Sequence, residues 1–367
     1  MEFKFDPYMN MEYSTIMLNG KIYGKAEILD IIGDVKRLNS LQENLKQIFS
    51  FIAEWTDDSD EIIVHTSGST GKPKIISVKK EHMINSALMT QNFFGLNKNS
   101  NVLLCMPVKY IAGKMMVVRT FVTGFNLMTL SPAANPFSGF NHRIDFTALT
   151  PFQLYHSVED IQRLNIHQII VGGGEIPVNL EKKIKHLSAS IYATYGMTET
   201  STHVALRKVN GDDSSEIYFA LSGIRFELDE RSCLIIQAPA LTNEDIVTND
   251  VIDLIDETHF TWKGRYDNVI NTGGIKVFPE AVEAKLSEFI NKPFFISYAK
   301  DEILSEKIVL IMQGIPLPEK DKSYLTERMK RVLTKYEMPR EIIYLDKFKY
   351  SGSGKILRSQ TRELASL

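Results

Sequence analysis

The stretch HTSGSTGKPKII, residues 65–76, concentrates residue types that bind a polyphosphate. Its glycines let successive backbone N–H groups form a concave nest, and its hydroxyl and lysine side chains add donors and positive charge. The flanking β-branched runs EIIVHT and KIISVK predict strands, so this stretch is expected to be a loop between them. It is not a Walker A loop, because Lys72 is followed by Pro73 and a strand instead of a helix. A flexible polar hairpin tip is the alternative that composition alone leaves open.

An alternation of short β-branched runs and helical patterns extends from about residue 60 to 195. It predicts βαβ units and a mainly parallel sheet. The run VGGGEIP follows one predicted strand, where nucleotides bind in such sheets. The predicted strands are 61–65, 102–106, 126–130, 168–171 and 190–193, and the predicted helices are 81–94, 112–122 and 151–164.

Two changes of pattern follow. Strands dominate residues 216–262, which predicts a small β-rich part at about 205–262. Beyond GRYDN, a helix opening at Pro279, two strands, a helix over 322–336 and a final strand predict a small α+β unit. Since 367 residues exceed what one core usually supports, we predict an α/β protein with two domains. These are an N-terminal domain of residues 1–266, which includes a lobe at 1–60, and a C-terminal domain of residues 268–367.

The composition is that of an ordinary soluble globular protein. Lysine and arginine number 42 against 45 acidic residues, and the net charge of −3 argues against a nucleic-acid partner. Cys105 and Cys233 are too few for a disulfide framework or a cysteine-based zinc site, which fits a reducing cytoplasm. The N-terminus lacks a signal-peptide pattern, and Arg119 interrupts the most apolar stretch, so neither secretion nor a membrane span is expected.

Five motifs occur in order along the chain: TSGSTGKPK (66–74), YGMTET (195–200), VTND (247–250), GRYDNVINTGGIKVFPEAVE (264–283) and SGSGKILR (351–358). Together they resemble the adenylate-forming superfamily of acyl-CoA synthetases, luciferases and peptide-synthetase adenylation domains. The resemblance covers residues from about 60 to the end. It implies a two-step reaction, in which a carboxylate attacks the α-phosphate of ATP and a thiol then displaces AMP from the acyl-adenylate.

The resemblance implies an ATP site with Mg²⁺. Tyr195 is expected to stack on adenine, Thr198 to donate to the α-phosphate, and Glu199 to hold the metal, which favours a carboxylate with phosphate oxygens and waters. The other ATP or AMP contacts that it implies are Thr66, Ser67, Gly68, Ser69, Thr70, Gly71, Lys74, Gly173, Gly174 and Gly196.

Asp250 and Arg265 match the positions that bind the ribose hydroxyls, since a carboxylate accepts and a guanidinium donates hydrogen bonds. Asn249 stands where the family has glycine, and its tolerance of left-handed geometry is expected to make that change harmless.

The C-terminal motifs imply a domain rotation between the two half-reactions. Asp267 matches the hinge, with an ordinary turn aspartate as the alternative. Lys355 matches the catalytic lysine of adenylation, where an ammonium stabilises developing charge. Gly274 and Lys276 are expected to face the channel of CoA, the thiol co-substrate.

Only about 60 residues precede the phosphate loop, and short forms of this kind resemble bacterial o-succinylbenzoate:CoA ligases of menaquinone biosynthesis. That acid carries a second carboxylate, which needs a cation or several donors in the pocket. Lys109, Lys114 and Arg119 are the cations of the segment MPVKYIAGKMMVVR. Arg119 is predicted to pair with the carboxylate, although a lone arginine on an apolar helix can also extend to the surface.

The remaining acyl-pocket residues are predicted around the same two segments. Tyr110 stands where the family usually has histidine, and an aromatic ring there can line the pocket. Ser201, Thr202 and His203 follow the adenylate motif and are expected to line it too.

Three alternatives stay open. A fatty-acyl- or aryl-CoA synthetase would use an apolar pocket lined by Met115, Met116 and Phe121. An amino-acid adenylating enzyme is disfavoured, because no aspartate for the α-amine can be placed near 109–122. An inactive nucleotide-binding homologue would lack Glu199 or Lys355, and both are present. The expected partners are a small carboxylic acid, ATP and CoA, and the oligomeric state is left open, a homo-oligomer included.

Overall fold

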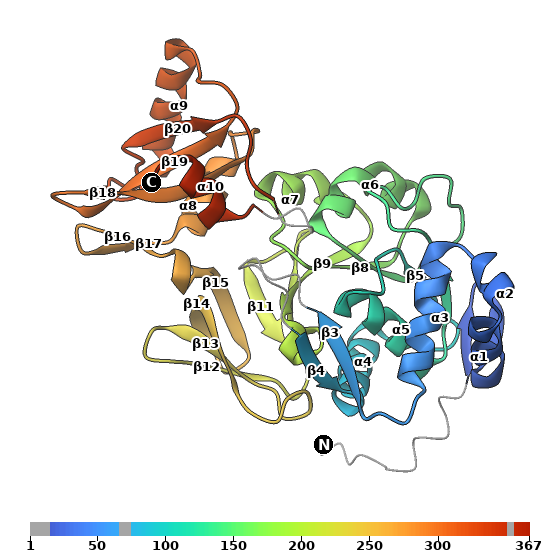
Figure 1. Ribbon diagram of the computed structural model, residues 1–367. Coiled ribbons are helices and arrows are strands. Elements are labelled where there is room, and N and C mark those ends of the chain that lie inside the picture. The colour runs from blue at the N-terminus through green and yellow to red at the C-terminus, as the bar shows by residue number, and fades with distance from the viewer. Residues whose placement is uncertain (1–14, 66–74, 351–355) are drawn as a thin grey trace.

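The computed structural model describes residues 15–65, 75–350 and 356–367. Its largest layer is a thirteen-stranded sheet in the order β12-β13-β14-β15-β11-β10-β9-β8-β7-β5-β6-β1-β2 (Figure 1). The parallel part consists of β1 (Thr15–Leu18), β5 (Asn101–Leu104), β6 (Asn126–Thr129), β7 (Phe146–Leu149), β8 (Gln168–Val171) and β9 (Ser190–Gly196). This arrangement confirms the predicted α/β class, with parallel strands at the centre of the sheet and antiparallel strands toward both edges.

Helices cover both faces of the parallel strands. Along β5, Val102 and Leu104 join one hydrophobic cluster and Leu103 joins the other, because successive side chains of a strand point to opposite faces. The first face packs against α1 (Lys25–Gly33), α3 (Glu43–Trp55), α4 (Lys80–Phe94) and α5 (Ile111–Thr123), with the short α2 (Val35–Asn39) beside α1. The second packs against α6 (Pro151–Leu164) and α7 (Val178–Ile184).

The strands that flank the glycine-rich loop form a hairpin. β3 (Glu61–His65) pairs antiparallel with β4 (Ile75–Lys79), and the two make a sheet of their own. Residues 61–65 therefore do not open the parallel series, as the alternation suggested, because the chain returns at once beside them. Residues 66–74 lie outside the described residues.

The β-rich stretch extends the main sheet with antiparallel strands. These are β10 (His203–Lys208), β11 (Ile217–Ala220), β12 (Arg225–Leu228), β13 (Cys233–Gln237), β14 (Ile246–Asp256) and β15 (His259–Arg265). At the opposite edge β2 (Lys21–Gly24) pairs antiparallel with β1, so part of the predicted N-terminal lobe belongs to the sheet.

The C-terminal residues build a separate sheet with its own core (Figure 1). Its strands are β16 (Ile270–Thr272), β17 (Ile275–Val277), β18 (Phe294–Asp301), β19 (Ser305–Gln313) and β20 (Glu341–Leu345), and its helices are α8 (Pro279–Ser287), α9 (Glu319–Val332) and α10 (Arg358–Leu364). The helix predicted to reach Tyr336 ends at Val332, because Leu333 takes an extended conformation. The domain boundaries and the mobility of this part stay predictions.

None of the helices within the described ranges has the length and apolar composition needed to cross a membrane.

Candidate active site

The carboxyl ends of β8 and β9 bring two predicted nucleotide segments together. The strands pair in parallel up to Val171 and Ala193, so the glycines after β8 and the end of β9 lie at one edge of the sheet. Gly173 has a φ of +81°, which favours glycine, and both Gly173 and Gly174 are exposed. At Gly196 a Cβ would clash with the backbone of Thr202 and His203, so glycine is required for the turn into β10.

A short 3-10 helix (Thr198–Thr200) follows β9 and carries the predicted phosphate and metal residues. Thr198 is half-buried and Glu199 is exposed. The described part of the chain contains no cluster of three or more His, Cys, Asp or Glu residues suited to a metal ion. A single exposed carboxylate fits a magnesium ion that takes its other ligands from phosphate and water.

Two predicted nucleotide residues, Tyr195 and Arg265, converge on the carboxylate of a third, Asp250, and each comes from a separate motif. Asp250 on β14 lies opposite Arg265 on β15, and the Tyr195 hydroxyl donates to Asp250 Oδ2 at 2.7 Å. Arg265 Nη1 lies 3.7 Å from Asp250 Oδ1. Burial, together with the neighbouring Asp250 charge, raises the pKa of Tyr195 well above its ordinary value, so the phenol stays a donor. Asp250 is 7% exposed and anchors this group.

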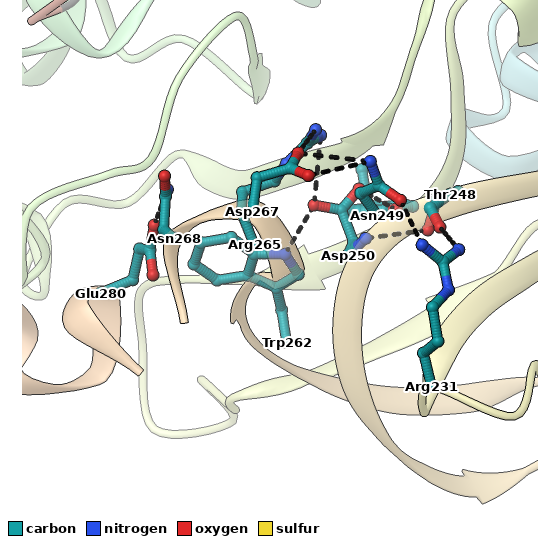
Figure 2. A network of polar contacts seen from close by, with 10 residues as sticks. Arg231, Thr248, Asn249, Asp250, Trp262, Arg265, Asp267, Asn268 and Glu280 are labelled. Atoms are coloured by element: carbon teal, nitrogen blue, oxygen red, sulfur yellow. Dashed lines mark hydrogen bonds and ion pairs between the residues drawn. The ribbon is translucent and has the colours of Figure 1, made fainter. Parts of the chain in front are cut away.

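Asn249 and Asp267 belong to the same polar network (Figure 2). Asn249 Nδ2 donates to both Asp267 oxygens at 3.2 Å, and its Oδ1 accepts from Arg231 Nη1 at 2.8 Å. Asn249 lies in β14 and is absent from the residues with positive φ, so the expected left-handed geometry is wrong. The side chain, instead of the backbone, explains what asparagine does at this position.

Arg119 is buried without a charged partner among the described residues. It is 2% exposed on α5, which excludes the alternative that it extends to the surface. Its Nη2 donates to Thr202 Oγ1 at 3.3 Å, and its Nη1 lies 3.5 Å from Met116 Sδ. Burial lowers the pKa of Arg119 to about 9, so the guanidinium still carries its charge at neutral pH.

Further polar side chains surround this cation. Thr202 Oγ1 also lies 3.1 Å from Ser86 Oγ and 3.3 Å from His203 Nδ1. Burial and the Arg119 charge lower the pKa of His203 to about 3, so its ring is neutral at pH 7. Within the described ranges, Arg119 Nε, Ser201 Oγ and His203 Nε2 are buried and have no hydrogen-bond partner. Buried polar atoms of this kind need a partner, and a small anion would supply acceptors to them.

The other two cations of the segment differ from Arg119. Lys114 donates to Glu54 Oε2 at 2.7 Å, so its charge is already paired. Lys109 is exposed. Tyr110 is the N-cap residue of α5 and is half-buried, about 13 Å along the helix axis from Arg119 at 1.5 Å per residue. The structure therefore groups Arg119 with Thr202 and His203, and does not bring Tyr110 to them.

The predicted CoA residues lie at the turn between β16 and β17. Gly274 has a φ of +81°, and Lys276 is exposed with its ammonium 6.0 Å from the Tyr266 ring centre. Among the described residues, neither Gly274 nor Lys276 makes a hydrogen bond or ion pair with Asp250 or Arg119. Lys355 and the loop residues Thr66, Ser67, Gly68, Ser69, Thr70, Gly71 and Lys74 lie outside the described residues.

Sequence reasoning missed several residues that touch these groups, two of which contact Thr202 or Asp250 directly. Ser86 is buried on α4 beside Thr202, and Trp262 on β15 donates its indole Nε1 to Asp250 Oδ1 at 3.2 Å. Neither belongs to a recognisable motif. A serine on an amphipathic helix and a tryptophan in a strand are both ordinary signals, so the sequence offered no means of finding them.

Comparison with known proteins places the chain among nucleotide-dependent enzymes. The family model described as AMP-binding enzyme matches residues 26–228. A 2-succinylbenzoate--CoA ligase from Lactococcus lactis is 25% identical over 85% of this chain and 73% of its own length. The structure of an acyl-CoA synthetase (AMP-forming)/AMP-acid ligase II-like protein from Dyadobacter fermentans is 32% identical, with a TM-score of 0.57 over 90% of this chain and 98% of that one.

An O-succinylbenzoate coenzyme A synthetase from Bacillus subtilis, in complex with AMP, has the same fold. Its TM-score is 0.69 at 20% identity, over 81% of this chain and 68% of that one. The family match covers more than half of this chain, and the Dyadobacter protein is similar over nearly its whole length. The chain therefore belongs to the AMP-binding enzyme family.

Proposed function

We propose that this chain is an AMP-forming acid:CoA ligase whose acid is o-succinylbenzoate and whose co-substrates are ATP, with Mg²⁺, and CoA. In the first step a carboxylate oxygen of the acid attacks the α-phosphorus and pyrophosphate leaves. In the second step the CoA sulfur attacks the acyl carbon, and AMP leaves with the bonding electron pair. Family membership and the names of the relatives support this chemistry.

The buried Arg119 cation is the observation that carries the choice of acid. An unpaired buried charge is costly, and a carboxylate is the partner that offsets the cost best. A monocarboxylic acid consumes its only carboxylate in the reaction, whereas o-succinylbenzoate has a second one. We propose that this second carboxylate accepts from Arg119, with Ser201 and His203 as further polar contacts.

The nucleotide is proposed to occupy the edge of the sheet beside Asp250. Tyr195 would stack on adenine, while Asp250 and Arg265 would hold the ribose hydroxyls. Thr198 would donate to the α-phosphate and Glu199 would hold Mg²⁺, which shields the phosphate charge. The loop 66–74 would bind the outer phosphates, and Lys355 would stabilise charge during adenylation.

The C-terminal sheet is proposed to be a domain that rotates about Asp267 between the two half-reactions. After rotation Gly274 and Lys276 would face CoA. Small molecules are the proposed partners, and the cytoplasm, where ATP and CoA are available, is the proposed location.

An apolar acid is the second candidate, because Met115, Met116 and Phe121 on α5 are all buried. A fatty or simple aryl acid would fit such a lining, but it would leave the guanidinium without an anion. Selectivity among acids therefore separates the two proposals.

A product assay tests the proposal. Purified protein is given ATP, Mg²⁺, CoA and an equimolar mixture of o-succinylbenzoate, benzoate, medium-chain fatty acids and amino acids, and thioesters and AMP are measured by mass spectrometry. The proposal expects AMP and o-succinylbenzoyl-CoA as the dominant products. A different dominant thioester would overturn the choice of acid, and absence of both AMP and thioester would overturn the ligase assignment.

A further inference from the structure

Trp262 contacts the carboxylate around which the proposed nucleotide site is built. Its indole Nε1 donates to Asp250 Oδ1 at 3.2 Å, while the Tyr195 hydroxyl donates to the other oxygen, Oδ2, at 2.7 Å. Figure 2 shows the indole directed at the Asp250 side chain, beneath Arg265. The two carboxylate oxygens are therefore each held by a different neutral donor.

A β-bulge directs the indole to this position. Val251 of β14 pairs with Gly264 of β15, but the next residue, Ile252, pairs with Trp262. Lys263 is the extra residue, and a shift of one residue moves a side chain to the opposite face of a sheet. Trp262 consequently lies on the face that carries Asp250, where regular pairing would have placed Lys263.

Glycine at position 264 permits this bulge. Its φ is +151°, a value that side chains with a Cβ rarely adopt. A Cβ there would also lie 2.6 Å from Oε2 of the buried Glu280. Gly264 thus has both a conformational and a steric reason to be glycine, and the bulge that it allows aims Trp262.

The hydrogen-bonding capacity of Asp250 suggests what this arrangement serves. A carboxylate has about four acceptor positions, two on each oxygen. Trp262 and Tyr195 occupy one position on each oxygen, which leaves one on each for a ligand. A vicinal diol, with two neighbouring hydroxyl donors, matches this remaining pair. Two protein donors at different oxygens also prevent the carboxylate from rotating about its Cβ–Cγ bond.

We propose that Trp262 is a positioning residue that holds the Asp250 carboxylate in the orientation that accepts both ribose hydroxyls of an adenine nucleotide. This inference rests on the proposed function, because it assumes that the nucleotide binds at Asp250. Trp262 acts through Asp250 and does not itself touch the reacting atoms.

The competing explanation is that Trp262 only fills space. The ring is half-buried and packs against the main hydrophobic cluster. Trp262→Phe keeps an aromatic ring and removes the N–H donor, so it separates donation from most of the packing. Trp262→His keeps a ring N–H and serves as the variant in which donation is partly restored.

Binding of two nucleotides to the chain of 367 residues tests the proposal. The affinity for AMP is compared with that for its dideoxy analogue, which lacks both ribose hydroxyls. Trp262→Phe should weaken AMP binding about tenfold, the usual effect of losing a hydrogen bond to a charged group, and should change binding of the dideoxy analogue less than about twofold. Trp262→His should recover part of the loss.

Tryptophan fluorescence gives a second measurement without altering Trp262. The chain has two tryptophans, so Trp55→Phe leaves Trp262 as the only one. AMP should shift the emission of this protein more than the dideoxy analogue does, because the ribose hydroxyls share Asp250 with the indole. This readout remains available if the Trp262 variants do not fold.

The outcomes are distinct. Equal weakening of both nucleotides by Trp262→Phe, or equal emission shifts with both in the Trp55→Phe protein, would overturn the positioning role while the nucleotide site stands. Binding of neither nucleotide to the unaltered protein would overturn the proposed function, and this inference with it.

Discussion

Asn249 donates hydrogen bonds from its side-chain amide to both carboxylate oxygens of Asp267, each at 3.2 Å. Its own carbonyl oxygen accepts from Arg231, whose Nε donates to Asp229. Asp267 also accepts from Arg265 at 3.1 Å. The proposed hinge residue is thus tied to the sheet of the N-terminal part by a residue that replaces the glycine of the family motif.

Replacing Asn249 by glycine should loosen the hinge. The two bonds are exposed, so they stabilise the observed orientation by about 1 kcal/mol or less. We expect Asn249→Gly to increase, by a few-fold, the rate at which added CoA consumes a preformed acyl-adenylate. The rate is measured in single turnovers. Asn249→Ala should raise this rate to a similar extent, and it does so without the added backbone freedom of glycine. Asn243→Gly removes a side-chain amide that accepts from Lys79 and should leave the rate unchanged. An unchanged rate in both Asn249 variants would contradict a restraining role.

Thr202 is expected to matter for the acid but not for ATP. Its hydroxyl oxygen accepts a hydrogen bond from Arg119 and lies beside Ser86. Thr202→Val therefore removes a hydrogen bond that orients the guanidinium. The KM for o-succinylbenzoate should rise about fivefold to tenfold, while the KM for ATP should stay within about twofold. Thr120→Val is the matched control, because Thr120 is buried on α5 and its side chain bonds, among the described residues, only to its own helix. Equal effects on both KM values would indicate a general loss of structure.

His203 should make the folded protein sensitive to acid. Its pKa is about 3 in the folded protein, because it is buried beside Arg119, and about 6.5 in the unfolded chain. As pH falls from 6.5 toward 3, the unfolded chain binds a proton that the folded protein does not, so stability decreases over this window. His203→Gln should reduce the loss of unfolding free energy between pH 6.5 and pH 4.5 by about 2 to 3 kcal/mol.

Urea unfolding at the two pH values measures this difference. His142→Gln changes an exposed histidine and should leave the pH dependence as in the unaltered protein. If His203→Gln retains the full loss of stability in acid, the buried neutral state of His203 is refuted.

Arg358 should stabilise the C-terminal part. It donates to both oxygens of Glu283 on α8, at 2.7 and 2.6 Å, and burial partly shields the pair from water. Arg358→Ala should lower the free energy of unfolding by about 2 kcal/mol, because it leaves the Glu283 carboxylate without its ion-pair partner. Arg225→Ala removes an arginine from an exposed pair with Glu257 and should cost less than about 0.5 kcal/mol. Similar losses in both variants would show that the Glu283 pair contributes no more than a surface contact.

The sequence predicted the parallel strands at the centre of the sheet, and it assigned Tyr195, Asp250 and Arg265 to one nucleotide site, because these depend on local pattern and on ordered motifs. The contacts among the three side chains appear only in the fold. The sequence led to Arg119 as the cation for the carboxylate, but it gave no sign that Lys114, a cation on the same apolar helix, is already paired. The difference lies in Glu54, which is 60 positions away in the sequence and pairs with Lys114 only after α3 and α5 pack together.

Trp262 illustrates a second limit. Strand periodicity alone assigns Lys263 to the Asp250 face, and one extra residue in β15 reverses that assignment. Such a bulge depends on the pairing of two strands and on the space beside Gly264, which no local pattern encodes.

The most direct test of the proposed acid specificity compares two acids in two proteins. The kcat/KM values for o-succinylbenzoate and for its mono-amide, in which the carboxylate that is not activated is neutral, are measured with the unaltered protein and with Arg119→Met. We predict that kcat/KM is about a hundredfold higher for the dicarboxylate than for the mono-amide in the unaltered protein. In the variant the two kcat/KM values should be nearly equal, because the second carboxylate no longer has a buried cation to pair with. An unaltered protein that uses both acids equally, or a variant that keeps the preference, would contradict the assignment of Arg119 and with it the proposed substrate.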